Sequence, residues 1–302
     1  MRRFLGLARG LGSNRWLRAA ALVLAAGVSL WSVRRLPDAS PLPALVGLAP
    51  WVIGKYMLCP LRWHALSVSG QQRRWHIRAY AESELLGLMS PGHAGADLWR
   101  VHRLNRAGML RTAAGAEVAL DRLVGAAGLA LAVAIAGATL PVRVLVALAG
   151  VAAVVSALGL VLRWRRPALF ALRPLPGPGP LAYGLLLSVG YQATIVCLLL
   201  GAVTAVGHPI NPLPLAAVFG ASQVAGIVPG VHGASPRDGA LVVGLAALGL
   251  SWAAALGAVA LATVLAWVPA LLLGGGSFAV RRLRRPDRAV RVLRPDLGEG
   301  GP

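Results

Sequence analysis

Charged residues are scarce in this sequence. They make up 13% of its 302 residues, whereas a typical soluble domain carries about 25%. Hydrophobic residues reach 57%, and several apolar stretches approach the ~20 residues that a helix needs to cross ~30 Å of hydrocarbon. The composition therefore excludes an ordinary soluble domain and predicts an integral membrane protein.

Acidic residues and lysine are scarcer still. Ten acids face 30 basic residues, which gives a net charge of +20, and Lys55 is the only lysine. In a soluble protein this excess would indicate nucleic-acid binding. Here the arginines flank apolar segments, which is typical of the cytoplasmic loops of membrane proteins. We therefore expect no nucleic acid as a partner, and we expect the arginines to attract anionic lipid headgroups.

Motifs that carry chemistry are also missing. Cys59 and Cys197 have no CxxC neighbour, and the histidines show no HExxH spacing, so we expect no metal. Neither GxxxxGKS nor GxxxxGKT occurs, so we expect no bound nucleotide and no other cofactor. Asp97 with His93 is the one loose candidate for an acid–base pair. We therefore expect that the protein is not an enzyme.

Six apolar segments are long enough to span a membrane. They cover about 17–33, 42–61, 118–139, 142–162, 181–206 and 251–274. Arginines concentrate in the basic tail 1–16, in the two connections 62–122 and 163–173, and in the basic, disordered tail 281–302. The positive-inside rule puts all four on the cytoplasmic side. The pattern predicts a multi-pass protein of a bacterial inner (plasma) membrane with both termini cytoplasmic.

Two further regions, 75–112 and 213–250, do not fit as simple spans. Each contains a PGxxG break after an apolar stretch; the residues of these breaks are Pro91, Gly92 and Gly95 in the first and Pro229, Gly230 and Gly233 in the second. For the arginine count to hold, each region must enter and leave the membrane on one side. We therefore expect two re-entrant helical hairpins, a backbone that survives at membrane depth where protein or a water-filled cavity surrounds it.

The order of these elements repeats along the chain. A first membrane half, 17–139, and a second, 140–280, each hold three spans and one hairpin. Because three is odd, the halves would insert with opposite orientations. The sequence thus predicts an all-α polytopic membrane protein of about six full spans plus two re-entrant helical hairpins, in two inverted-topology halves. Breaks at matching positions of inverted halves indicate a transporter binding site.

Three arginines near the hairpins are the candidate headgroup-binding residues. We expect Arg100, Arg122 and Arg237 either to hold a lipid phosphate, which suits their bidentate fork, or to pair with neighbouring acids. The supporting acids are Asp97, Asp121 and Asp238. The hairpin glycines, including Gly239, would let the backbone approach a headgroup closely. His93 and His232 lie in the two loops; they could couple transport to protons, but polar loop residues are the simpler interpretation.

The segments 85–104, 117–125 and 228–265 resemble the flippase-like transmembrane domain of lysylphosphatidylglycerol synthases and of stand-alone bacterial and archaeal membrane proteins. The family's Pro-Gly-x-x-Gly-Glu stretch ending in Arg is matched by Asp97 and Arg100, with the acid displaced by one. Its acidic-Arg pair is matched by Asp121-Arg122. Its Arg-Glu-Gly ending is matched by Arg237-Asp238-Gly239. Gly125 replaces a further family acid, which weakens a proton relay.

The resemblance implies lipid translocation or a supporting role in lipid and glycan assembly. No stretch here corresponds to the soluble aminoacylating domain of the synthases, so we do not expect synthase activity. The leading hypothesis is a flippase-like transporter of an anionic phospholipid or polyprenyl-linked lipid. Two alternatives stay open: a non-catalytic membrane partner of a glycosyltransferase or lipid-synthesis enzyme, and an intramembrane lipid-modifying transferase.

Overall fold

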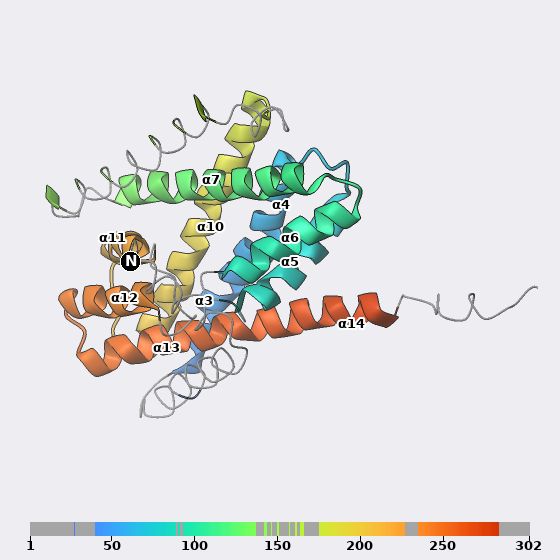
Figure 1. Cartoon of the computed structure of the whole chain (residues 1–302). Helices are drawn as coiled ribbons and strands as arrows, with labels where there is room; N and C mark the ends of the chain where they lie inside the picture. Colours follow the sequence, from blue (N-terminus) through green and yellow to red (C-terminus); the bar gives the residue numbers. More distant parts are fainter. Residues whose placement is uncertain are drawn as a thin grey trace, which may run out of the picture.

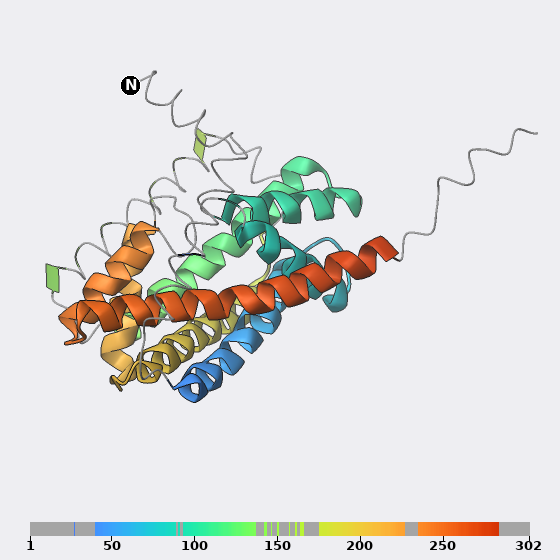
Figure 2. The same cartoon turned by 90° about the horizontal axis from the view of Figure 1, so that it is seen from below.

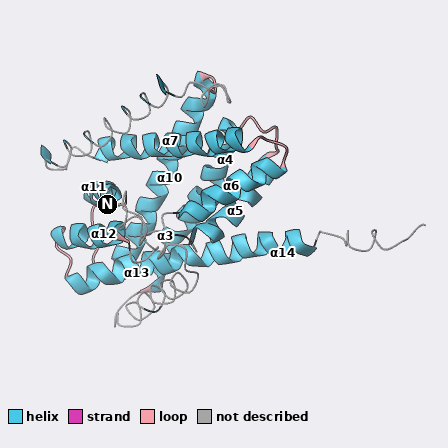
Figure 3. Cartoon of the chain, in the orientation of Figure 1, coloured by secondary structure: helices cyan, strands magenta, loops and turns pink. Residues whose placement is uncertain are grey.

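The computed structural model describes four main stretches of the chain. They are 40–88 (with 90), 93–136, 175–226 and 235–283, together with isolated positions between 27 and 165. Every regular element in these stretches is helical (Figure 3). The prediction of an all-α protein is therefore confirmed for the described part of the chain.

Four helical rods in these stretches are long and apolar enough to cross a membrane. They are Pro41–Leu66, Arg111–Ala136, Pro178–Ala205 and Trp252–Arg281. Large apolar side chains such as Ile53 and Leu186 are well exposed on them, as expected for surfaces that face lipid. The rods correspond to the predicted spans 42–61, 118–139, 181–206 and 251–274, and they indicate a membrane protein.

The other two predicted spans, 17–33 and 142–162, lie largely outside the described residues, as do the two basic tails. The count of six spans, the inverted halves and the cytoplasmic termini therefore stay predictions.

Two of the four rods contain a wider π-helical turn. The first rod consists of α3 (Pro41–Ile53), the π turn η1 (Gly54–Leu58) and α4 (Cys59–Leu66). Pro60 has no N–H to donate, and its ring would clash with a carbonyl one turn earlier; a wider turn relieves that clash. The last rod consists of α13 (Trp252–Pro269), η4 (Ala270–Gly274) and α14 (Gly275–Leu283), which run on as one long helix (Figure 2).

The other two rods are single helices, α7 (Arg111–Ala136) and α10 (Pro178–Ala205). α10 packs against α3, α4, α7 and α13 and so holds the described part of the bundle together. It approaches α3 closely: a Cβ atom on Gly47 would collide with the carbonyl oxygen of Cys197. Small residues that let two backbones approach are typical of membrane helix interfaces.

The two regions predicted as hairpins are pairs of packed helices. The first pair is α5 (Arg73–Leu88) with α6 (Ala94–Arg106), and the second is α11 (Pro212–Ala225) with α12 (Pro236–Ala247). They lie to either side of α10 (Figure 1). Both pairs contact α7, through α6 and α11. The two regions that lie outside the predicted spans therefore pack into the same helix bundle.

Candidate functional site: a cavity between the two helix pairs

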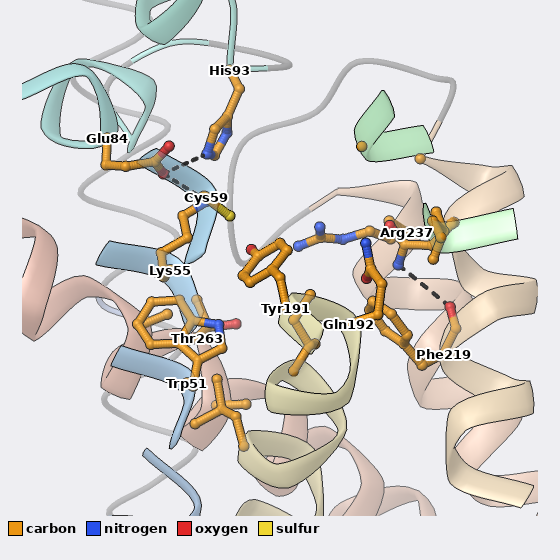
Figure 4. Close-up of a pocket in the computed structure, with 18 of the residues that line it drawn as sticks. Trp51, Lys55, Cys59, Glu84, His93, Tyr191, Gln192, Phe219, Arg237 and Thr263 are labelled. Atoms are coloured by element: carbon orange, nitrogen blue, oxygen red, sulfur yellow. Dashed lines mark hydrogen bonds and ion pairs between the residues drawn. The ribbon is translucent and has the colours of Figure 1, made fainter. Parts of the chain in front are cut away.

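A cavity of about 510 Å³ lies among the membrane helices and is lined by both helix pairs. This volume falls in the ~300–1,000 Å³ range of small-molecule sites. Much of its wall is apolar, with contributions from Trp51 on α3, Leu198 on α10, Phe219 on α11 and Val259 on α13. Against this background Figure 4 shows two groups of polar side chains, one on either side of Tyr191.

The first polar group consists of Lys55, Glu84 and His93. Lys55 Nζ lies 2.8 Å from Glu84 Oε2, and His93 Nε2 lies 3.5 Å from the same oxygen (Figure 4). The three residues come from η1, α5 and the start of α6. The lysine also lies 5.6 Å from the centroid of the Tyr191 ring and 5.9 Å from that of Tyr80. The Glu84 carboxylate is thus held at the cavity wall by the Lys55 ammonium and the His93 imidazole.

The ionisation of Glu84 follows from these neighbours. Burial raises the pKa of its carboxyl, but the charge of Lys55 and the hydrogen bond to His93 outweigh burial, so the pKa lies well below its usual range. Glu84 is therefore a carboxylate at neutral pH for as long as Lys55 stays beside it.

Local backbone geometry aims His93 at this carboxylate. His93 precedes α6 and has φ 62°, the left-handed conformation that few residues other than glycine adopt. Its ring lies against Gly87 of α5, where an added Cβ atom would come within 3.1 Å of His93 Cδ2. The glycine therefore makes room for the imidazole beside Glu84.

The second polar group surrounds Arg237 at the start of α12. Its guanidinium reaches across the cavity toward Tyr191, and the amide of Gln192 lies beside it (Figure 4). Arg237 Nη2 lies 3.4 Å from Asp238 Oδ1. The other oxygen of Asp238 accepts hydrogen bonds from the backbone N–H and hydroxyl of Ser235, which closes a capping box. Asp238 is thus engaged in starting the helix, and Arg237 extends into the cavity.

A third group of charges, the Asp121 cluster of Asp121, Arg62 and Arg100, adjoins the cavity. Arg62 donates to both oxygens of Asp121 at 2.7 and 3.1 Å, and Arg100 donates two hydrogen bonds to Oδ2 at 2.9 and 3.0 Å. The Arg100 guanidinium also lies over the rings of Trp63 and Tyr80, 4.9 and 4.5 Å from their centroids. Asp121 and Arg100 do not line the cavity; Arg62 does.

The sequence-predicted arginines therefore have different surroundings. Arg122 and Arg237 line the cavity, whereas Arg100 does not. Arg122 pairs with Asp97 at 2.9 Å, and Arg100 pairs with Asp121. The arginines thus pair with the acids singled out from the sequence, and two of the three also face a space that can hold a ligand.

The predicted acids and glycines divide in the same way. Asp238 lines the cavity, and Asp97 and Asp121 do not. Gly95 is packed so closely that a Cβ atom would lie 2.7 Å from the Leu86 carbonyl oxygen, whereas Gly239 has open space around it. The remaining hairpin positions lie outside the described residues, namely Pro91, Gly92, Pro229, Gly230 and Gly233, and so does His232.

Sequence reasoning missed Lys55, Glu84, Tyr191 and Gln192 as cavity residues. A signal for Lys55 was present, because an ionisable residue inside a membrane span is costly and is a functional candidate by default. The loose acid–base candidate takes a different form: His93 faces Glu84, and Asp97 engages Arg122. Within the described stretches, no three His, Cys, Asp or Glu side chains gather in a way that could hold a metal ion.

Neither the protein-family models nor the curated proteins compared with this chain give a match.

Proposed function

We propose that this protein carries an anionic lipid between the leaflets of a bacterial inner membrane, with the lipid headgroup in the cavity. The observation that carries the proposal is the cavity wall itself. Lys55, Arg122 and Arg237 face one space that has both polar and apolar walls and is lined by both helix pairs. Arginine binds phosphate through a bidentate fork, and lysine binds it as a point charge. The apolar walls suit the glycerol backbone or first carbons of a lipid.

The finer architecture belongs to the same proposal. In it the two helix pairs are re-entrant hairpins of two inverted halves, both termini are cytoplasmic, and the chain is a stand-alone member of the flippase-like family that it resembles. Rocking of one half against the other would open the cavity to each leaflet in turn. The ligand would be an anionic phospholipid or a polyprenyl-linked lipid.

Scrambling of headgroup-labelled phosphatidylglycerol in proteoliposomes tests the proposal. Wild-type protein should move the label faster than protein-free vesicles do. Arg237→Ala should slow the movement ~10-fold or more, because a hydrogen bond to a charged group is worth about 1.5–3 kcal/mol. The matched control is Arg78→Ala, which removes an exposed arginine of α5 outside the cavity lining and should leave the rate unchanged.

The other outcomes assign other roles. If wild-type protein moves neither phosphatidylglycerol nor a labelled polyprenyl phosphate, transport is wrong, and a supporting role beside a glycosyltransferase or lipid-synthesis enzyme takes its place. An equal loss of scrambling rate in the Arg78 and Arg237 variants would mean that lipid movement depends on the overall positive charge of the protein and not on the cavity.

A further inference from the structure

We propose that Lys55 is a second anion-binding residue of the cavity and that Glu84 competes with the phosphate of a lipid headgroup for it. In this exchange the phosphate takes the place of the Glu84 carboxylate on Lys55, and one proton enters the site. The inference deepens the proposed function and rests on it for the identity of the ligand as a lipid.

The first argument is that this site already holds an oxyanion. The Glu84 carboxylate receives Lys55 Nζ at 2.8 Å and His93 Nε2 at 3.5 Å, from two elements that converge on the cavity. A carboxylate oxygen and a phosphate oxygen are the same kind of charged acceptor. All three side chains line the cavity, so a phosphate in that space lies within reach of the donors that now hold Glu84.

The second argument is that Lys55 is placed unlike a purely structural cation. The arginines of the Asp121 cluster are fixed by planar, multiple hydrogen bonds. Lys55 instead has three rotatable donors on a flexible stem, and it extends from a π-helical turn, a distortion that is frequent at functional sites. A lysine with a single carboxylate partner can exchange that carboxylate for another anion without unfolding its surroundings.

The third argument concerns charge. Glu84 is 5% exposed, so a carboxylate left there without Lys55 would be strongly destabilised and would take up a proton from solution. The other titratable groups around Glu84 and Lys55 are Tyr80 on the same helix as Glu84, Tyr56 on η1, Cys59 on α4, Tyr191 on α10 and Arg122 on α7. The proton would therefore go to the Glu84 carboxylate that the phosphate has displaced from Lys55.

Calorimetric titration of the purified full chain in detergent tests the exchange. Dioctanoyl phosphatidylglycerol is titrated at pH 7 in two buffers with different protonation enthalpies, which yields both the affinity and the number of protons bound. Wild-type protein should take up about one proton per lipid. Glu84→Gln removes the competitor and its titration, so it should bind the lipid ~10-fold more tightly or better, with no proton uptake. Lys55→Met should lose most of the binding, and Lys55→Arg should restore it.

Glu82→Gln is the matched control. Glu82 is a buried acid on the same helix, but it pairs with Arg103 and does not line the cavity. This variant should keep both the affinity and the proton uptake of wild-type protein. Size-exclusion chromatography and a thermal melt of each variant separate lost binding from lost folding.

Inorganic phosphate is the second probe. Proton uptake with phosphate at higher concentration would show that the headgroup oxyanion alone drives the exchange; uptake with the lipid alone would assign it to phosphate that arrives on a lipid. Weaker binding in Glu84→Gln, binding without proton uptake in wild-type protein, or no binding of either probe would overturn the inference. Binding with proton uptake but without scrambling in vesicles would overturn transport and leave the exchange intact.

Discussion

Asp121 and Glu84 are both buried carboxylates held by basic side chains, but they do different things in this bundle. Asp121 is 0% exposed and is bound by Arg62 and Arg100, so the cluster contains more positive than negative charge and its carboxylate is saturated. Glu84 has Lys55 and His93 beside it and lines the cavity. The chemistry of the two sites is alike, and access to the cavity separates them.

That difference shows how to distinguish a structural ion pair from a candidate binding pair. The Asp121 cluster joins α4, α6 and α7 through four hydrogen bonds to one carboxylate. Glu84 is held by a single short contact to a flexible side chain. Removing Asp121 should therefore damage the fold, and neutralising Glu84 should alter binding.

The largest effect is expected for Asp121→Ala. It leaves two buried guanidinium groups without a counter-ion, and breaking a buried pair in this way costs about 3–5 kcal/mol. We expect little folded protein after membrane extraction, measured as the monodisperse fraction on size-exclusion chromatography and as the melting temperature in detergent. Glu84→Gln, assayed in parallel, should stay folded. If Asp121→Ala melts at the same temperature as wild-type protein, the Asp121 cluster is not structural. The distinction between the Asp121 and Glu84 sites is then wrong.

The positions of the membrane helices could be predicted from the sequence better than the side-chain contacts between them. The spans at 42–61 and 181–206 could be predicted because the apolar length needed to cross a membrane is a property of one segment. The pairing of Asp121 depends on residues 59 and 21 positions away, Arg62 and Arg100. Arg62 looked like an ordinary cytoplasmic charge, because the positive-inside rule accounts for it without any partner.

Two parts of the site show why the rest was missed. Asp121 and Arg122 are adjacent on one helix, and adjacent residues point in different directions, so they serve different partners. Lys55 and Glu84 meet only because η1 and α5 come together in the fold. A search for repeated loop motifs draws attention to the PGxxG breaks and passes over a pair whose members lie in helices.

A smaller effect on stability is expected when the pH is lowered. It tests the packing around the Asp121 cluster. His76 packs against Trp63 of that region and is fully buried, and burial lowers its pKa to about 4. Folding therefore disfavours its protonation. The contribution of the neutral His76 imidazole to the free energy of unfolding is fully present above the ordinary histidine pKa of ~6.5. It is lost as the pH falls toward 4.

Melting temperatures measured between pH 7 and pH 4 test this expectation. His76→Phe cannot take up the proton, so the wild-type protein should lose more of its melting temperature over that range than the variant does. Parallel curves for the two proteins would show that the imidazole is not protonated on unfolding. His208→Phe serves as the control, because His208 is an exposed histidine outside this cluster and outside the cavity lining.

The smallest effect is expected for Asp97→Asn, which probes a pair between the two extremes. Arg122 and Asp97 are 2.9 Å apart, but their side chains are 47% and 35% exposed. Such a pair contributes about 0–1 kcal/mol, so the melting temperature should hardly change. Arg122 lines the cavity, however, and without Asp97 it is free to contact a phosphate there. We therefore expect equal or slightly tighter binding of dioctanoyl phosphatidylglycerol, measured by calorimetry. A loss of stability as large as that of Asp121→Ala would mean that exposure to the cavity does not separate structural pairs from binding pairs in this protein.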